Sequence, residues 1–203
     1  MPTSKHRTQP LTTDELFDRA LAIADNEGLE ALTMRRLAAE VGVEAASLYH
    51  HLPNKDALLD GVVIRMRSEI RIPDPVPTDW KELMLQIFAE YRRVIAAHPN
   101  LTPLAGRRVE TDPGEGGGLV FLTTLGFTTD DAVELWQSLI AFVVGFSVFS
   151  SAYIESDTSD LPSSLATRMT DWRDETCIRT LRAIIDTYDA HKEHRDPEPP
   201  TPS

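Results

Sequence analysis

The most constraining feature of this chain is the stretch of residues 32–55, where two short helical patterns flank a single glycine. Leu37 and Val41 fall on one face of the first predicted helix. Ala38 is small enough to let the backbones of two crossing helices approach, and Gly42 can turn the chain. The stretch therefore predicts two short helices that cross steeply through a tight turn.

The second predicted helix of this pair presents small and hydrogen-bonding groups to solvent. Val43 and Leu48 can close over the apolar face of the first helix, so the remaining side chains point outward. These are Ala45, Ala46, Ser47, Tyr49 and His50, and no acidic residue follows Glu44 among them. Such groups fit the major groove of DNA, and the pattern predicts a helix-turn-helix DNA-binding domain.

This region resembles the TetR family of bacterial transcription regulators. The likeness extends over residues 11–70 and rests on Leu32-Thr33, Arg35, Leu37-Ala38, Gly42, Ser47-Leu48-Tyr49, His51, Asn54-Lys55 and Ala57-Leu58-Leu59. Later, Trp80, residues 88–93 and Gly126-Phe127 are similar to the tetracycline repressors themselves. The resemblance implies a homodimeric, sequence-specific repressor that leaves an inverted-repeat operator when a small, largely apolar molecule binds its C-terminal domain.

The resemblance also assigns contacts with bases or phosphates. The residues it indicates are Arg35, Ala45, Ser47, Tyr49, His50, His51 and Lys55, and we add Thr33 and Arg36 as candidates. Arg35 can bond guanine through two hydrogen bonds, and Lys55 lies where a phosphate can meet a helix N-terminus. Each has an alternative: Tyr49 can pack the domain, His51 can bond the backbone, and Arg35 can be a solvated surface charge. Tetracycline repressors carry glutamine in place of Ala45 and tryptophan in place of His50, so their operator sequence is not transferred to this chain.

The whole chain predicts an all-α fold, because apolar residues recur at three-to-four spacing and alternation with period two is hard to find. We expect an N-terminal three-helix helix-turn-helix domain joined by a fourth helix to a larger helical ligand-binding and dimerisation domain. The expected boundaries are a flexible arm at 1–10, the DNA-binding domain with its linker helix at 11–72, the effector-binding and dimerisation domain at 73–192, and a disordered tail at 193–203.

Several helix ends can be predicted from local residues. Thr12 and Glu15 match a capping box, and Gly28 is expected to end the helix that they begin. Thr33 and Asn54 are expected to cap the second and fourth helices. A further helix should stop at His98-Pro99, and a short one should follow around residues 101–108.

In the C-terminal part, Gly114, Gly116, Gly117 and Gly118 lack the strand and the Gly-Lys-Ser/Thr sequence of a phosphate loop, and we interpret them as a flexible connection. The longest helix is expected at about residues 130–153 and the last at about 171–191. Together with the same helices of a second subunit they would form a four-helix dimer bundle.

A small, mostly apolar or aromatic effector would suit a cavity built from large apolar side chains. The candidates are Met66, Ile70, Phe88, Tyr91, Leu104, Phe121, Trp136, Phe142 and Phe146, each of which has ordinary core packing as its alternative. Tetracycline repressors hold a magnesium chelate with a histidine near residue 106, and residues 104–107 contain none. A magnesium–tetracycline effector is therefore not expected.

Charge and composition narrow the remaining function classes. The net charge is −12, of which residues 1–71 carry −2, with nine basic against eleven acidic residues. We expect a cytoplasmic protein without cofactor, metal or membrane partner, since the N-terminus lacks a signal peptide and the apolar run at 139–149 is short for a membrane span. No constellation of catalytic residues stands out by spacing, so we expect no enzyme. A helical adaptor that binds only protein remains the alternative.

Overall fold

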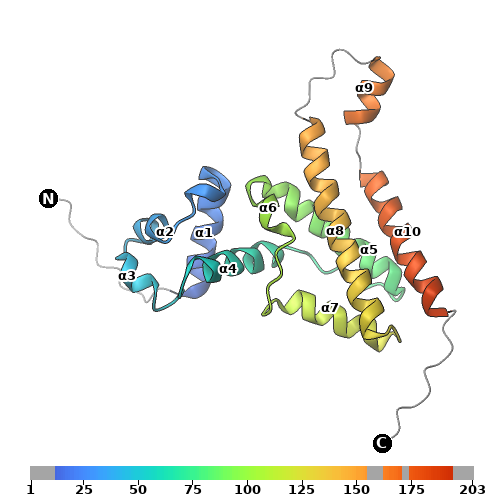
Figure 1. Cartoon of the computed structure of the whole chain (residues 1–203), viewed down its shortest axis with the longest axis horizontal. Coiled ribbons are helices and arrows are strands. Elements are labelled where there is room, and N and C mark those ends of the chain that lie inside the picture. Colours follow the sequence, from blue (N-terminus) through green and yellow to red (C-terminus); the bar gives the residue numbers. More distant parts are fainter. Residues whose placement is uncertain (1–11, 155–161, 171–173, 194–203) are drawn as a thin grey trace, which may run out of the picture. The chain divides into compact units, whose positions relative to one another are not determined.

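The computed structural model describes residues 12–154, 162–170 and 174–193, and within these ranges the chain forms helices and no strand (Figure 1). The expected all-α fold is confirmed. The chain divides into two compact units. Unit 1 contains the described residues up to Ser68 together with His98–Val109, and unit 2 contains Glu69–Ala97 and the described residues from Glu110 onward.

Unit 1 is a small bundle whose helix ends follow the expected local signals. Its elements are α1 (Thr13–Glu27), η1 (Leu29–Ala31), α2 (Met34–Val41), α3 (Ala45–Leu48), α4 (Lys55–Arg67), η2 (Pro99–Leu101) and α6 (Thr102–Ala105). The side-chain oxygens of Thr12, Thr33 and Asn54 accept hydrogen bonds from backbone N–H groups three residues later, at 3.3, 3.1 and 2.8 Å. These three predicted caps are confirmed, as is the end of α1 at Gly28.

The core of unit 1 lies where α1 packs against α2 and α4. Its fully buried side chains include Leu16, Ala20, Leu37, Leu48, Leu58 and Val62. At the crossing of α1 and α4, a Cβ added to Gly61 would lie only 1.8 Å from the ring of Phe17. Gly61 therefore leaves room for the Phe17 ring where α4 packs against α1.

The segment His98–Val109 differs from expectation, because its contacts are with the helices of unit 1 although it falls within the C-terminal domain expected at 73–192. Nδ1 of His98 lies 2.9 Å from a carboxylate oxygen of Asp25, and the amide of Asn100 donates to the Ala24 and Asp25 carbonyl oxygens at 3.1 and 3.0 Å. The C-terminal end of α1 is therefore bound by side chains that come from far along the chain.

The same segment is attached to α4 through two arginines. Arg67 donates to the carbonyl oxygens of Ala105 and Arg107 at 2.9 and 2.8 Å. Arg107 in turn reaches the carboxylates of Asp60 and Asp56 at 2.6 and 3.2 Å. These contacts join residues 38 to 51 positions apart in sequence. Helix α4 thus carries polar links to residues 105–107 both from its first turns, at Asp56 and Asp60, and from its last residue, Arg67.

Unit 2 is a second helical bundle, formed by α5 (Trp80–Ala97), α7 (Pro113–Thr124), α8 (Thr129–Ile154), α9 (Ser163–Thr170) and α10 (Asp174–Glu193). Helix α8 packs against α5, α7, α9 and α10, and α5 also packs against α10. The buried side chains include Phe88, Leu122, Leu135, Leu139, Val143, Leu181 and Ile185. Lys81 links α5 to α10 through Asp186 and Asp189 at 3.1 and 2.6 Å.

Helix α7 corrects one expectation, since Gly114, Gly116, Gly117 and Gly118 lie within it and not in a loose connection. Asp112 caps this helix by accepting from the backbone N–H of Gly114 at 2.9 Å, and Pro113 occupies its first turn. A Cβ on Gly118 would lie 2.1 Å from the ring of Trp136 on α8. The glycine is needed at this position because the indole occupies the space that a side chain would fill.

Helix α8 has more apolar surface than unit 2 covers. Within Thr129–Ser150 the most apolar window of 18 residues has a mean hydropathy of 1.7, so by length and composition the helix could cross a membrane, a test that core helices also pass. Only 33% of this window is buried within the described structure, and Val148 and Phe149 are 49% and 58% exposed.

Candidate nucleic-acid interface

The turn between α2 and α3 has the predicted construction. Gly42 adopts φ 72° and ψ 33°, a left-handed conformation that disfavours residues with a Cβ. Beyond it, the N–H of Val43 donates to the carbonyl oxygen of Ala38 at 3.0 Å. Ala38 is 2% exposed, so its methyl group is buried where the two helices meet. The orientation of α3 on α2 is set by this short turn.

Helix α3 is shorter than expected, because it spans only Ala45–Leu48 and the next residues form a turn. Tyr49 keeps right-handed helical angles, and the N–H of Leu52 donates to the Leu48 carbonyl oxygen at 2.8 Å. Leu48 and Leu52 are buried at 0% and 2% exposure. These two side chains anchor the α3 region to the core and leave its other face to solvent.

The predicted contact residues of this region lie on that solvent face. Ser47, His50 and His51 are exposed, Tyr49 is 53% exposed, and Ala45 is half-buried. An exposed ring favours contact with a partner over the packing role considered for Tyr49. This part of unit 1 therefore presents two hydroxyl groups and two imidazoles to solvent, groups that can bond phosphates or base edges.

Three further predicted residues lie at the N-terminal ends of α2 and α4. Arg35 and Lys55 are exposed, and neither has an ion-pair partner among the residues that the structure describes. Thr33 is exposed as well, but its hydroxyl oxygen accepts the capping hydrogen bond from Arg36 N–H. A cation beside a capped helix N-terminus is a favourable place for a phosphate.

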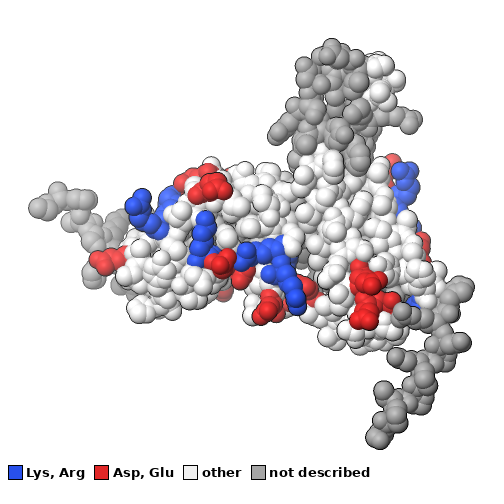
Figure 2. Space-filling view, viewed as in Figure 1, with Lys and Arg blue, Asp and Glu red and all other residues white. Residues whose placement is uncertain are grey.

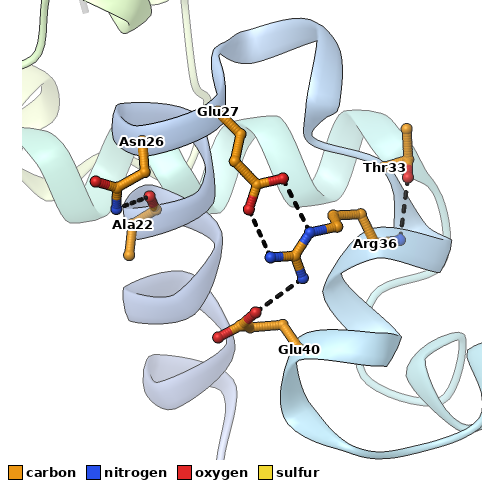
Figure 3. Close-up of polar contacts among 6 residues, drawn as sticks. All are labelled: Ala22, Asn26, Glu27, Thr33, Arg36 and Glu40. Atoms are coloured by element: carbon orange, nitrogen blue, oxygen red, sulfur yellow. Dashed lines mark hydrogen bonds and ion pairs between the residues drawn. The ribbon is translucent and has the colours of Figure 1, made fainter.

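Arg36, which is also a candidate DNA contact by sequence, forms ion pairs with two carboxylates. Its guanidinium contacts Glu27 of α1 through two hydrogen bonds, at 2.5 and 3.0 Å, and Glu40 one turn along α2 at 2.8 Å (Figure 3). Chiefly because of the hydrogen bonds from Arg36, the pKa of Glu27 is lowered from its ordinary value of 4.5. The pKa of Arg36 is raised, mainly by Glu27 and then by Glu40. Arg36 therefore links α1 to α2, and we leave it out of the proposed DNA contacts.

Charges of both signs are interspersed on unit 1. Figure 2 shows basic side chains beside acidic ones on its visible face, in agreement with the small negative charge of residues 1–71. Affinity for a polyanion depends on the local field, so individual cations such as Arg35 and Lys55 matter more than the sum.

The predicted effector residues are divided between the units. Met66 and Leu104 belong to unit 1, whereas the other candidates (Ile70, Phe88, Tyr91, Phe121, Trp136, Phe142 and Phe146) belong to unit 2. In unit 2 the rings of Phe88 and Trp136 meet edge to face at 5.3 Å, and those of Phe142 and Phe146 lie 5.7 Å apart. The structure thus brings two pairs of these aromatic side chains together along α5 and α8.

The described part of the chain contains one cysteine, Cys177, and its His, Cys, Asp and Glu side chains were the candidates for metal ligands. Burial raises the pKa of the Cys177 thiol from 9.0 to about 11, an effect that nearby Arg92 partly offsets, so the thiol stays protonated at neutral pH. No group of three or more His, Cys, Asp or Glu side chains in the described ranges could hold a metal ion.

Sequence reasoning missed the side chains that attach His98–Val109 to unit 1, namely His98, Asn100, Arg67 and Arg107. Asp56 and Asp60 stand four residues apart on one face of α4, a pattern that suggests a cationic partner. Nothing local identifies that partner as Arg107, which lies 47 residues beyond Asp60.

Comparisons with known proteins agree with this geometry. A profile of the family described as bacterial regulatory proteins, tetR family, matches residues 16–62. An HTH-type transcriptional regulator from Saccharopolyspora erythraea is 30% identical over 170 residues, which cover 81% of this chain and 72% of the relative. The chain belongs to the TetR family. Further members, one of them a solved structure, support the same assignment over most of the chain.

The class A tetracycline repressor from transposon 1721 in Escherichia coli is 30% identical to this TetR-family chain over 190 residues, or 88% of the chain and 82% of the repressor. The crystal structure of the Streptomyces coelicolor TetR family protein ActR in complex with actinorhodin matches with a TM-score of 0.71 at 29% identity, covering 91% of this chain and 99% of ActR. The predicted family and the helix-turn-helix are confirmed. The protein is a TetR-family transcriptional regulator that binds DNA, and these relatives are regulators, not enzymes.

Proposed function

We propose that the protein is a homodimeric repressor that binds an inverted-repeat operator and is released by a small, largely apolar effector. The observation that carries this proposal is the α3 region, where Leu48 and Leu52 are buried while Ser47, Tyr49, His50 and His51 face solvent. A helix-turn-helix of this kind inserts its second helix into the major groove. The protein would act in the cytoplasm, where the bacterial chromosome lies, and without enzymatic activity.

We propose that side chains of α2, the α3 region and α4 contact the DNA directly. Arg35 would bond a guanine or a phosphate, and Lys55 would meet a phosphate at the N-terminus of α4. Ser47, Tyr49, His50 and His51 would bond phosphates and base edges, the Ala45 methyl could contact a thymine methyl, and Thr33 would stay close to the backbone of the duplex.

Dimerisation is supported by the apolar surface of α8. About two thirds of its most apolar window is half-buried or exposed within the described structure, and Val148 and Phe149 are exposed. A second copy of α8 and α10 could cover this surface in a four-helix arrangement. Two copies of unit 1 would then read two half-sites.

Release by an effector requires a connection between the two parts of the chain. We assign effector binding and dimerisation to the expected C-terminal domain, with His98–Val109 counted instead with the DNA-binding domain. This segment continues directly from α5 and leads into α7, while its side chains hold α1 and α4. An effector that prefers one arrangement of α5 and α7 would thus change the position of α4 and the separation of the two DNA-binding domains.

The decisive experiment selects bound sequences from a random DNA library with the full-length protein at moderate salt. We expect an inverted repeat whose half-sites lie about one helical turn apart. Absence of any preferred inverted repeat would refute the repressor proposal.

Two neighbouring substitutions then test the interface on the selected site. Arg35→Ala should weaken operator binding by about 1–3 kcal/mol, or about 5- to 150-fold, without changing the dimer. Arg36→Ala removes the same charge one residue later, from a side chain already bound to Glu27 and Glu40, and serves as the matched control. Equal losses in a gel-shift titration would remove Arg35 from the proposed contacts.

A further inference from the structure

We infer that the effector is a planar aromatic molecule bearing an oxygen acceptor, and that the indole N–H of Trp136 is the donor that recognises this oxygen. The inference rests on the proposed function, because it specifies the ligand chemistry of unit 2. It depends on hydrogen-bonding groups inside unit 2 that the bundle itself does not satisfy.

The first such group is Nε1 of Trp136. The side chain is 9% exposed, and Nε1 is buried with no hydrogen-bond partner within the described residues. Buried tryptophan N–H groups usually find a partner, because a buried donor that has lost water and gained no acceptor carries an uncompensated desolvation cost. A ligand oxygen bonded to Nε1 would remove this cost.

The indole is held from its other edge. The six-membered ring occupies the space beside Gly118 on α7, where an added Cβ would meet Cζ3, Cη2 and Cε3 at 2.1, 2.3 and 2.9 Å. The ring of Phe88 packs edge to face at a centroid distance of 5.3 Å. Trp136 therefore packs against both α5 and α7, and Nε1 belongs to the five-membered ring, not to the six-membered ring that lies beside Gly118.

The second unsatisfied group is Nε of Arg92, one helical turn after Phe88 on α5. This nitrogen is also buried without a hydrogen-bond partner in the described part of the chain. The guanidinium lies 5.2 Å from the ring centroid of Phe146 on α8, and its Nη1 pairs with Asp174. A second donor on the α5 side of the same bundle, attached to a cation, favours an anionic oxygen on the ligand.

These two nitrogens are the only buried side-chain polar atoms without a partner that occur in the described ranges, and both are donors. A ligand that satisfies these two nitrogens must therefore supply hydrogen-bond acceptors and not donors. The rings around them, Phe88, Trp136 and Phe146, suit a flat apolar body. A carboxylate or carbonyl on an aromatic ring combines both properties.

The test uses the full-length protein with 15N-labelled indole nitrogens, which gives one N–H signal for each of its three tryptophans. The probes are 2-naphthoate and 2-methylnaphthalene, which share a ring system and differ in the acceptor. We expect 2-naphthoate to bind about tenfold or more tightly than 2-methylnaphthalene, since a hydrogen bond to a charged group contributes about 1.5–3 kcal/mol. Binding should also move the Trp136 signal downfield.

Variants separate recognition from packing. Trp136→Phe should lose the preference for 2-naphthoate, whereas the matched control Trp80→Phe should keep it, because Trp80 packs on Phe127 elsewhere in unit 2. If Trp136→Phe does not fold, Trp80→Phe and Trp172→Phe assign the signals by elimination.

Equal affinities for the two probes, no binding of 2-naphthoate, or an unmoved Trp136 signal would overturn the inference. All of these measurements are made without DNA, so they stand apart from the operator selection. A Trp136 site in a protein that selects no operator would refute the repressor and leave the ligand site intact.

Discussion

The close approach of α7 to Trp136 allows a sharp test with two adjacent glycines. Gly117 and Gly118 both lie inside α7, but a Cβ on Gly117 would meet nothing within 4 Å, whereas one on Gly118 would lie 2.1 Å from the Trp136 ring. Alanine in a helix interior is more favourable than glycine by about 1 kcal/mol. Gly117→Ala should therefore stabilise the protein by about this amount.

Gly118→Ala gains the same helix propensity but must displace the indole. Trp136 is 9% exposed and packs on Phe88, so the ring cannot turn into solvent. Forcing an additional methyl group into such a core costs about 1–3 kcal/mol, which leaves a net destabilisation of up to about 2 kcal/mol. The two variants should thus differ by the full overpacking cost.

The measurement is thermal unfolding of the wild type and both variants at one protein concentration, since a dimer's Tm depends on concentration. For a chain of this length 1 kcal/mol shifts Tm by about 2–4 °C, so Gly117→Ala should raise Tm by that amount and Gly118→Ala should leave it unchanged or lower it. Equal increases in both variants would show that α7 does not pack rigidly on Trp136. In a double variant, Gly118→Ala with Trp136→Leu, the two changes in stability should not add, because the two residues touch.

Three further outcomes follow from the contacts described. Lys55→Ala should reduce the salt dependence of operator binding by about one unit of slope, and an unchanged slope would exclude a phosphate contact. Because the pKa of Glu27 is lowered from 4.5 in the folded protein, its ion pair with Arg36 stabilises the fold above pH 4.5, and this contribution is lost as the pH falls through the lowered pKa. Glu27→Gln should therefore destabilise the protein at neutral pH, and the difference from the wild type in unfolding followed by circular dichroism should shrink as the pH is lowered below 4.5. The buried Cys177 thiol, with a pKa of about 11, should react with a thiol reagent at pH 7 only as fast as the protein unfolds, and rapid reaction of the native protein would contradict its burial.

The structure also bears on how the DNA-binding domain should be tested. A fragment ending at residue 70 would lack His98, Asn100 and Arg107, whose side chains bind α1 and α4. Experiments on operator binding therefore need the full chain, and loss of binding by the fragment alone would not argue for a protein-binding adaptor.

Local sequence determined much of unit 1. The caps at Thr12, Thr33 and Asn54 and the left-handed turn at Gly42 depend on residues within three or four positions of each other, so their outcome could be predicted. The same holds for the all-helical fold, because apolar periodicity reports which face of each helix is buried. The family could be identified from these residues as well.

Tertiary structure decided the features that depend on distant partners. A side chain at Gly118 is disfavoured only because Trp136, eighteen positions later, occupies the space that it would fill. Arg36 could be a DNA contact by sequence, yet Glu27 of another helix binds it, and Arg107 joins α4 across 47 residues. The helix propensity of a residue is a local property. The free energy of burial and ion pairing depends instead on which groups the fold brings within contact distance. No local sequence pattern specifies those distant partners.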